Sequence, residues 1–170
     1  ARWDPTKDHA TFLRAALDLA QTRPDARFVL VGGGVDAHNP ALSALIAELG
    51  LASRVHLLGE RADVPRLTAA LDVATCSSIG EGFPNAVGEA MACGIVVVST
   101  DVGDTATVLL DSGVVVPPYD PAGLADGWRT VLAMAPAERA ALGRRARERV
   151  IEQYDAAGIA ARYAALYREL

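Results

Sequence analysis

Aromatic residues are scarce in this chain and make up only 5% of its 170 residues. Apolar residues nevertheless account for 51%, with many alanines, valines and leucines, which is typical of an α/β protein. The length suits one domain with a sizeable core, and no internal repeat, low-complexity segment or long linker divides the chain. We therefore expect residues 1–170 to form a single domain, with a terminal helix over about 155–170.

Positive charge and long apolar runs are also lacking. The net charge is −5 without an uninterrupted basic stretch, so a nucleic-acid partner is not expected. No apolar run approaches the length needed to cross a membrane. The two cysteines, Cys76 and Cys93, are interpreted as small buried residues in a reducing compartment, which predicts a cytoplasmic protein. A disulfide between them stays possible on sequence alone.

Residue patterns for metal chemistry are absent from the sequence. There is no Asp-x-Asp pair and no His/Cys cluster with the spacing of metal ligands. A metal-dependent sugar transferase and a zinc enzyme are therefore disfavoured, and we expect no metal site. The tripeptide Gly80-Glu81-Gly82 is not a nucleophile elbow, because the serine that this motif needs is missing.

What the sequence does have is a regular alternation of apolar runs and helical segments. This alternation predicts a doubly wound, Rossmann-like parallel sheet. The expected strands are 28–31, 55–58, 72–76, 95–99 and 114–116. Ligands of such sheets bind at the carboxyl ends of the strands. The residues expected just after strands, or in loops that open helices, are Lys7, Gly33, Gly59, Glu81 and Asp101.

A run of three glycines follows the first expected strand. Gly32, Gly34 and Ala37 fit the dinucleotide fingerprint that ends in alanine. That fingerprint requires a helix to open at the glycines, whereas Asn39-Pro40 marks a helix start several residues later. We therefore favour a loop that passes close to a nucleotide, with a plain turn as the alternative.

Two glutamates lie eight positions apart in segment 77–101. Glu81 is expected in a loop, and Glu89 near the middle of a short helix over 86–93 that Asn85 caps and Gly94 ends. A helix amino terminus at the carboxyl end of a parallel strand is a ready anion site. Glu89 lies among small apolar residues, where a carboxylate needs a partner such as a pair of ligand hydroxyls. The alternative is a plain surface glutamate at each position.

The first residues carry a second candidate group. Asp4-Pro5-Thr6 forms a turn before a helix that reaches about Thr22. Lys7 is then expected in the first turn of that helix, where the helix dipole disfavours a cation and a bound phosphate would reverse the penalty. A solvated lysine is the alternative. His9 is expected on the helix surface rather than in a catalytic role.

The sequence EGFPNAVGEAMACG around the glutamates, and the VVVSTDVGD that follows, resemble the donor-binding motif of the group 1 (family 4) retaining glycosyltransferases of the GT-B fold. Glu81 and Glu89 match the two glutamates of that motif, which seven residues separate. The resemblance covers most of the chain but only one half of the usual enzyme. It implies the C-terminal, nucleotide-sugar domain of a GT-B protein without the N-terminal acceptor domain.

The resemblance also implies roles for single residues. Arg2 and Lys7 match the Arg and Lys that hold the donor diphosphate, although Asp8 stands where the family usually has glycine. The Glu81 equivalent contacts sugar hydroxyls and the Glu89 equivalent binds the ribose. The remaining candidates are the backbone of Gly82 and Phe83 near the sugar, Gly33 in the loop near the nucleotide, and Glu60 near the nucleobase.

The expected function is therefore donor binding in a retaining glycosyltransferase. A sugar would pass from a nucleotide-sugar, with UDP or GDP as the nucleotide, to a sugar or lipid-linked acceptor, and no cofactor would be required. The acceptor, and any membrane association, would depend on the missing N-terminal domain, so we expect the isolated domain to be inactive. The alternatives are a non-catalytic nucleotide-sugar-binding module and a GT-B-type epimerase.

Two further expectations concern the ends of the chain. In the family a strand precedes the residue matched by Arg2, between strands 28–31 and 72–76, so here it is absent or a stub. Either the natural chain continues upstream, or the gap is filled by re-pairing of those two strands or by a second copy. In the last helix, Ile159, Tyr163, Leu166 and Tyr167 form one stripe. That stripe is either ordinary core or, as the GT-B fold implies, partly exposed.

Overall fold

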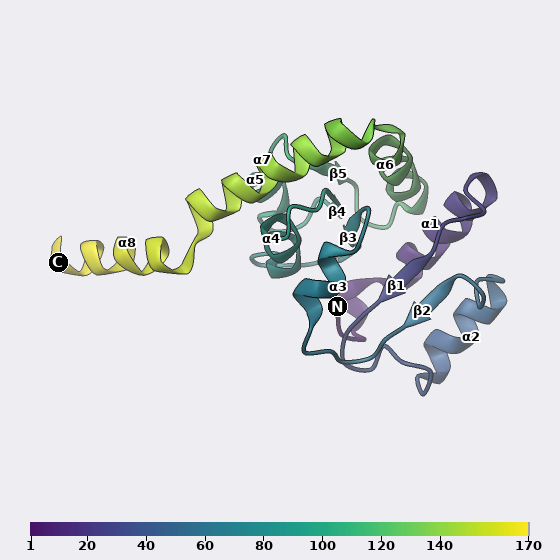
Figure 1. Cartoon of the computed structure of the whole chain (residues 1–170). Helices are drawn as coiled ribbons and strands as arrows, with labels where there is room; N and C mark the ends of the chain where they lie inside the picture. Colours follow the sequence, from purple (N-terminus) through teal and green to yellow (C-terminus); the bar gives the residue numbers. More distant parts are fainter. Residues whose placement is uncertain (170) are drawn as a thin grey trace.

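The computed structural model describes residues 1–169 and contains two parallel sheets (Figure 1). In the first sheet, β1 (Phe28–Leu30) pairs with β2 (Val55–Leu57). In the second, β3 (Ala74–Cys76), β4 (Val97–Thr100) and β5 (Val114–Val116) pair in that order. All five strands lie where the apolar runs predicted them, and every pairing is parallel. The α/β class is confirmed.

Helices connect the strands. A short 3₁₀ turn, η1, covers Pro5–Lys7. The α-helices are α1 (His9–Thr22), α2 (Pro40–Glu48), α3 (Val64–Ala69), α4 (Asn85–Ala92), α5 (Thr105–Leu109), α6 (Pro121–Ala133), α7 (Pro136–Tyr154) and α8 (Ala156–Glu169). Helix α2 begins after Asn39, whose side chain accepts a hydrogen bond from Leu42 N at 3.0 Å. The late helix start expected after the glycine run is therefore confirmed.

Strand β4 shows that helices cover both faces of its sheet. Val98 belongs to a core cluster that includes residues of α1 and α6, whereas Val97 belongs to a second cluster with residues of α4 and α7. Successive side chains of a strand point to opposite faces, and both valines are buried. The doubly wound arrangement expected from the sequence is thus present, with its two hydrophobic layers separated by the sheet.

Strands β1 and β3 do not pair, so the sheets stay separate within residues 1–169. Re-pairing of these strands, one expected way to fill the gap, is therefore wrong. Residues 1–3 instead lie beside the chain that follows β1: Ala1 N donates to Val31 O at 2.7 Å and Trp3 N to Gly33 O at 2.8 Å. This segment is the stub of the expected strand, and it spans only the carboxyl end of the gap.

Trp128 on α6 connects the two sheets from one side. Its ring lies 5.9 Å from the ring of Phe28 on β1, between centroids. Its indole Nε1 donates to Thr75 Oγ1 on β3 at 2.9 Å. A single buried side chain thus holds both strands that border the gap, through packing on one and a hydrogen bond on the other.

Two arginines of α7 bond to backbone carbonyls near the ends of other helices. Arg147 donates to the carbonyl of Ala92, the last residue of α4. Arg149 donates to the carbonyl of Val108 near the end of α5 at 2.8 Å. Carbonyls in the last turn of a helix lack intrahelical partners, and cationic side chains satisfy them well. These arginines therefore fasten α7 to the ends of two other helices.

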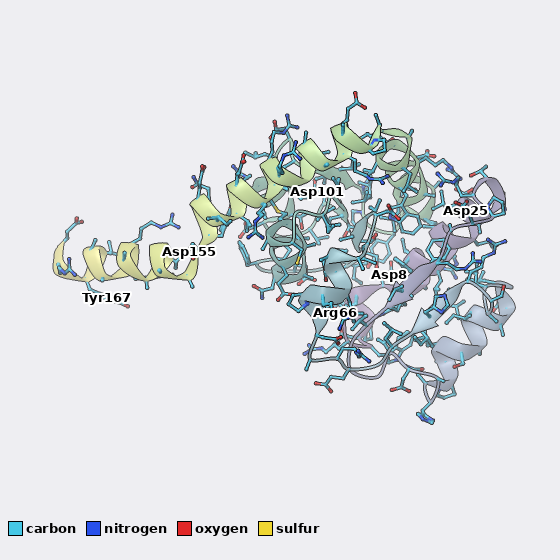
Figure 2. All side chains as sticks on the ribbon, in the orientation of Figure 1. Asp8, Asp25, Arg66, Asp101, Asp155 and Tyr167 are labelled. Atoms are coloured by element: carbon cyan, nitrogen blue, oxygen red, sulfur yellow. The ribbon has the colours of Figure 1, made fainter. Side chains whose placement is uncertain are left out.

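Helix α8 extends away from the body of the domain (Figure 1). It contains no buried residue among those described, and Tyr163 and Tyr167 are 60% and 71% exposed. Figure 2 shows Tyr167 on this helix, away from the body of the domain. The core alternative for the predicted stripe is therefore wrong. Asp155 caps this helix, because its Oδ2 accepts from Gly158 N at 3.0 Å. Within residues 1–169 no helix combines the length and apolar character of a membrane span.

Candidate functional site

An ion pair between residues far apart in sequence forms the centre of the candidate site. Lys7 Nζ lies 2.6 Å from Glu81 Oε1, and the same oxygen accepts from Ser78 Oγ at 2.7 Å. The two charged side chains are only 21% and 16% exposed. Burial opposes ionisation of Glu81, but the hydrogen bonds from Lys7 and Ser78 outweigh it and lower the pKa of this carboxyl.

The sequence predicted Lys7 in the first turn of α1, but this prediction is wrong. Lys7 is the last residue of the 3₁₀ turn that precedes α1. The cause is Asp8, whose φ of 42° is left-handed and interrupts the helical path. Glycine adopts such a conformation without strain, which fits the glycine that the resembling family usually has here. The carboxylate of Asp8 caps α1 by accepting from Thr11 N at 3.1 Å. Its charge is therefore tied to the helix start.

His9 is buried, contrary to the surface position expected for it, with 8% of its surface exposed. The ring of Trp3 lies 5.1 Å away, between ring centroids. Burial, followed by the nearby amino terminus, lowers the pKa of His9 to about 4. His9 is consequently neutral at physiological pH and adds no positive charge beside Lys7.

Arg2 lies in the stub, and its side chain points into solvent. Its side chain is 73% exposed, and Nε is 3.5 Å from Asp4 Oδ2, a loose contact. The stub places Arg2 beside the loop of Gly33, since the flanking Trp3 bonds to Gly33 O. Gly33 in turn faces Glu60, because a Cβ added to this glycine would lie 4.0 Å from Glu60 Oε2. The structure thus brings three of the predicted residues to one edge.

The loop of Gly82 and Phe83 is open on its outer side. A Cβ added to Gly82 would meet nothing within 4 Å, so a ligand has free access to this backbone. On the inner side, a Cβ at Gly103 would lie 2.3 Å from Gly82 O, and Asp104 N donates to the same oxygen at 3.2 Å. Only glycine fits at position 103, where φ is 53° and the two loops touch.

Helix α4 begins one residue earlier than expected. Asn85 is its first residue rather than its cap, and Pro84 at the cap position provides no side-chain hydrogen bond. Its amino terminus is therefore left without a side-chain cap. The end of the helix is as predicted: Gly94 has a φ of 74° and donates to Met91 O at 2.8 Å.

Glu89 is exposed on α4, so the prediction that it lies in an apolar setting and needs a partner is wrong. Its small neighbours Val87 and Ala90 point into the core, whereas Glu89 points outward. Desolvation lowers the pKa of the Ala1 amino group, and the charges of Lys7, Glu89 and Glu81 also act on it. Glu89 is the fifth residue of α4, the helix that follows the loop of Glu81.

Comparison with known proteins shows the family to which this chain belongs. A family model described as "Glycosyl transferases group 1" matches residues 1–134. The chain belongs to this family. N-acetyl-alpha-D-glucosaminyl L-malate synthase of Bacillus anthracis is 32% identical over 151 residues, which cover 88% of this chain and 39% of that protein. The lipopolysaccharide core biosynthesis mannosyltransferase LpsB of Rhizobium meliloti is 30% identical over 168 residues, covering 92% and 48%.

Solved structures of similar proteins support the same family and show the fold. The crystal structure of Anabaena Alr3699/HepE in complex with UDP has a TM-score of 0.89 at 29% identity, covering all of this chain and 47% of that one. The same Anabaena protein has also been solved with UDP-glucose. This group 1 glycosyl transferase chain therefore has the GT-B type of α/β fold, as predicted. It spans less than half of the length of these relatives, 39% and 48% of the two curated proteins and 47% of the Anabaena chain.

Sequence reasoning missed the hydroxyl residues that support the ion pair of this group 1 transferase. Ser78, which is 2% exposed, bonds to Glu81, and Ser77 Oγ donates to Lys7 O at 2.9 Å. Thr100 Oγ1 in turn donates to Ser78 O at 2.5 Å. The signal was two successive serines directly after a buried strand, where side chains of a parallel sheet reach the ligand edge.

Two open hollows are lined by residues near the stub and near the loop of Phe83. One, of about 540 Å³, is lined by residues that include Trp3, Gly34 and Asn39. The other, of about 410 Å³, lies between the loop of Phe83 and the start of α8. Neither is lined by Lys7 or Glu81. Within residues 1–169, no group of three or more His, Cys, Asp or Glu residues is placed to hold a metal ion.

Proposed function

We propose that this domain binds the nucleotide-sugar donor of a glycosyltransferase that retains the configuration of the transferred sugar. The observation that carries the proposal is the Lys7–Glu81 pair at the carboxyl end of β3, beside the uncapped start of α4. Departure of the nucleoside diphosphate from the sugar builds up negative charge. Lys7 and Arg2 are the cations that would stabilise this charge in the transition state.

Each remaining candidate has a place in this arrangement. Glu81 would accept hydrogen bonds from sugar hydroxyls, with the open backbone of Gly82 and Phe83 beside it. Glu89, exposed on α4, would bind the ribose. Gly33 and Glu60, which face each other, would border the nucleobase. These assignments follow the family resemblance, and the common edge of the sheets supports them.

In this arrangement, Glu81 and a bound diphosphate would compete for Lys7. Lys7 contacts Glu81 at 2.6 Å in the free domain, so an arriving diphosphate must share Lys7 with Glu81 or displace Glu81 from it. Release of Glu81 would then leave its carboxylate free for the sugar. The pair thus couples phosphate binding to sugar binding within one small group of side chains.

UDP is the nucleotide we propose first, because the similar Anabaena protein binds UDP and UDP-glucose in its crystal structures; GDP is the second. The acceptor would be a sugar or a lipid-linked sugar held by the other half of the whole enzyme, at the cytoplasmic side of any membrane involved. Calorimetric titration of the domain with UDP, GDP and ADP at low salt tests donor binding. An absence of binding to all three would contradict the proposal.

The two glutamates are expected to separate nucleotide binding from sugar binding. Glu89→Gln should weaken UDP binding about tenfold to hundredfold, because a lost charged hydrogen bond amounts to roughly 1.5–3 kcal/mol. Glu81→Gln should leave UDP affinity nearly unchanged, with any change toward tighter binding since Lys7 loses a competitor, yet weaken UDP-sugars. Calorimetry with UDP and with a panel of UDP-sugars measures both effects.

Glu48→Gln provides the matched control for these variants. Glu48 is an exposed glutamate at the end of α2 and takes no part in the ion pair. It should bind both kinds of ligand as the unmodified domain does. If the variants of Glu81 and Glu89 gave the same change for UDP and for UDP-sugars, the division of roles would be wrong.

The isolated domain is expected not to transfer sugar, whichever acceptor is offered. Correct orientation of two reactants can supply about 7–11 kcal/mol of the barrier, and in a GT-B protein it depends on two domains that face each other. Slow hydrolysis of the donor is the most we expect, and Lys7→Ala should remove it. Mass spectrometry of donor and acceptor after long incubation measures both, and robust transfer would contradict this view.

A further inference from the structure

The last residue of α7 touches the loop that carries the candidate sugar-binding groups. The ring of Tyr154 lies 5.2 Å from the ring of Phe83, between centroids, at an angle of 53°. Tilted aromatic pairs at this separation attract each other. Tyr154 also packs against the core cluster formed with residues of α4 and α7. It therefore joins the loop to the fixed part of the domain.

The other contacts of this loop hold different parts of it. Lys7 and Ser78 hold the carboxylate of Glu81. Asp104 holds the carbonyl of Gly82. Phe83 has no polar anchor for its side chain, which is 39% exposed. Beneath it lies Gly88 of α4, where an added Cβ would be 3.9 Å from the Phe83 ring.

Tyr154 is also the point at which the chain leaves the domain body. Helix α8 starts two residues later and has no buried residue among those described. Asp155, between the two helices, is extended with a φ of −59° and a ψ of 134°. The hollow of about 410 Å³ beside this junction is lined by both Phe83 and Tyr154. The donor loop and the helix junction thus share one aromatic contact.

We propose that Tyr154 is a positioning residue for the sugar part of the donor. It restricts Phe83, and through Phe83 the backbone of residues 82–84 at the start of α4. A loop that is free to move must lose conformational freedom when it closes on a ligand, and this loss weakens binding. The proposal rests on the proposed function, because it assigns the sugar to this loop and the nucleotide to other residues.

The contact between the rings, rather than the hydroxyl, carries this effect. The two contacts of Tyr154 described above, with the Phe83 ring and with the core cluster, are packing contacts. Tyr154→Phe should therefore behave as the unmodified domain does. Tyr154→Ala removes the ring, and Tyr154→Leu keeps apolar volume for the core while it removes the aromatic contact. The leucine variant keeps the proposal testable if the alanine variant fails to fold.

The experiment compares each nucleotide-sugar with its own free nucleotide. A panel of UDP- and GDP-linked hexoses is titrated by calorimetry, and the tightest donor is then measured with each variant beside UDP or GDP. We expect Tyr154→Leu and Tyr154→Ala to weaken the nucleotide-sugar about tenfold and the free nucleotide less than twofold. We expect Tyr154→Phe to stay within twofold for both ligands.

Phe83→Ala completes a double-mutant cycle. Because Tyr154 is proposed to act through Phe83, the double variant should bind the nucleotide-sugar no more weakly than Phe83→Ala alone. If the Tyr154 variants lost affinity equally for the nucleotide-sugar and the free nucleotide, Tyr154 would only support the stability of the domain, and the proposal would be overturned. Unchanged affinity for both ligands would overturn it as well. If the unmodified domain bound no nucleotide or nucleotide-sugar, the proposed function itself would fail, which is a separate outcome.

Discussion

Replacement of both Arg2 and Lys7 by alanine is expected to abolish detectable binding of UDP. Each cation would form a charged hydrogen bond to the diphosphate, and loss of one costs roughly 1.5–3 kcal/mol. Together the two losses lower affinity by about 10² to 10⁴, since about 1.4 kcal/mol is a factor of ten. Loss of Lys7 also leaves Glu81 without its partner at 2.6 Å, which places an uncompensated negative charge beside the phosphates.

Arg23→Ala with Arg27→Ala is the matched control. It removes two positive charges as well, but these arginines lie just before β1, at the end of the strand opposite the candidate site. UDP affinity at low salt should change only slightly in this control. Calorimetry compares the two double variants directly. Unchanged affinity of the Arg2/Lys7 variant for UDP would contradict the assignment of the diphosphate to this edge of the sheet.

A strand inserted between β1 and β3 is expected to stabilise the domain by several kcal/mol. Within residues 1–169 the two strands border separate sheets, and the stub of residues 1–3 bonds to Val31 and Gly33, which follow β1. Backbone groups that face the gap lack strand partners, and each buried unsatisfied group costs about 1–3 kcal/mol. For a domain of marginal stability this is a large share of the total.

The measurement is urea unfolding of the chain with and without a five-residue apolar, β-branched segment fused before Ala1. The same segment fused after the last residue is the control, because it adds composition without reaching the gap. We expect a higher midpoint only for the first fusion. An equal midpoint in the two fusions would contradict the expectation. A midpoint of the unextended chain that rises with protein concentration would instead show that a second copy fills the gap.

The fold could be predicted from the sequence because its strands are short apolar runs with clear boundaries. Val114–Val116 is an example, ended by Pro117-Pro118 as expected. The strand expected at 95–99 begins instead at Val97. The reason is that Ile95 N still donates to Ala90 O at 3.1 Å, so this residue belongs to the end of α4. Because Ile95 is as apolar as the residues of the strand, hydrophobicity alone does not show where α4 ends and the strand begins.

The candidate site was less predictable, because its geometry depends on contacts between distant segments. Family resemblance indicated Lys7 and Glu81, but nothing local predicts that residues 74 positions apart form an ion pair. The left-handed conformation of Asp8 had only one indirect signal, the glycine that the resembling family usually has at this position, since this conformation is uncommon for other residues. That one dihedral moves Lys7 out of α1. The same segment buries His9, which was expected on the helix surface.

The fastening of α4 by α7 has an electrostatic consequence for the loop at its other end. Arg147 supplies a positive charge where the helix ends at Ala92, whereas Pro84 supplies no compensating group where it begins. The partial charges of a helix are opposite at its two ends. Among residues 1–169, an arginine bonds to the negative end of α4, whereas the cap residue gives the positive end no side-chain hydrogen bond. The partial positive charge of the helix amino terminus therefore lies beside Glu81. A bound anion at this position would compensate that charge, as Arg147 does at the other end of the helix.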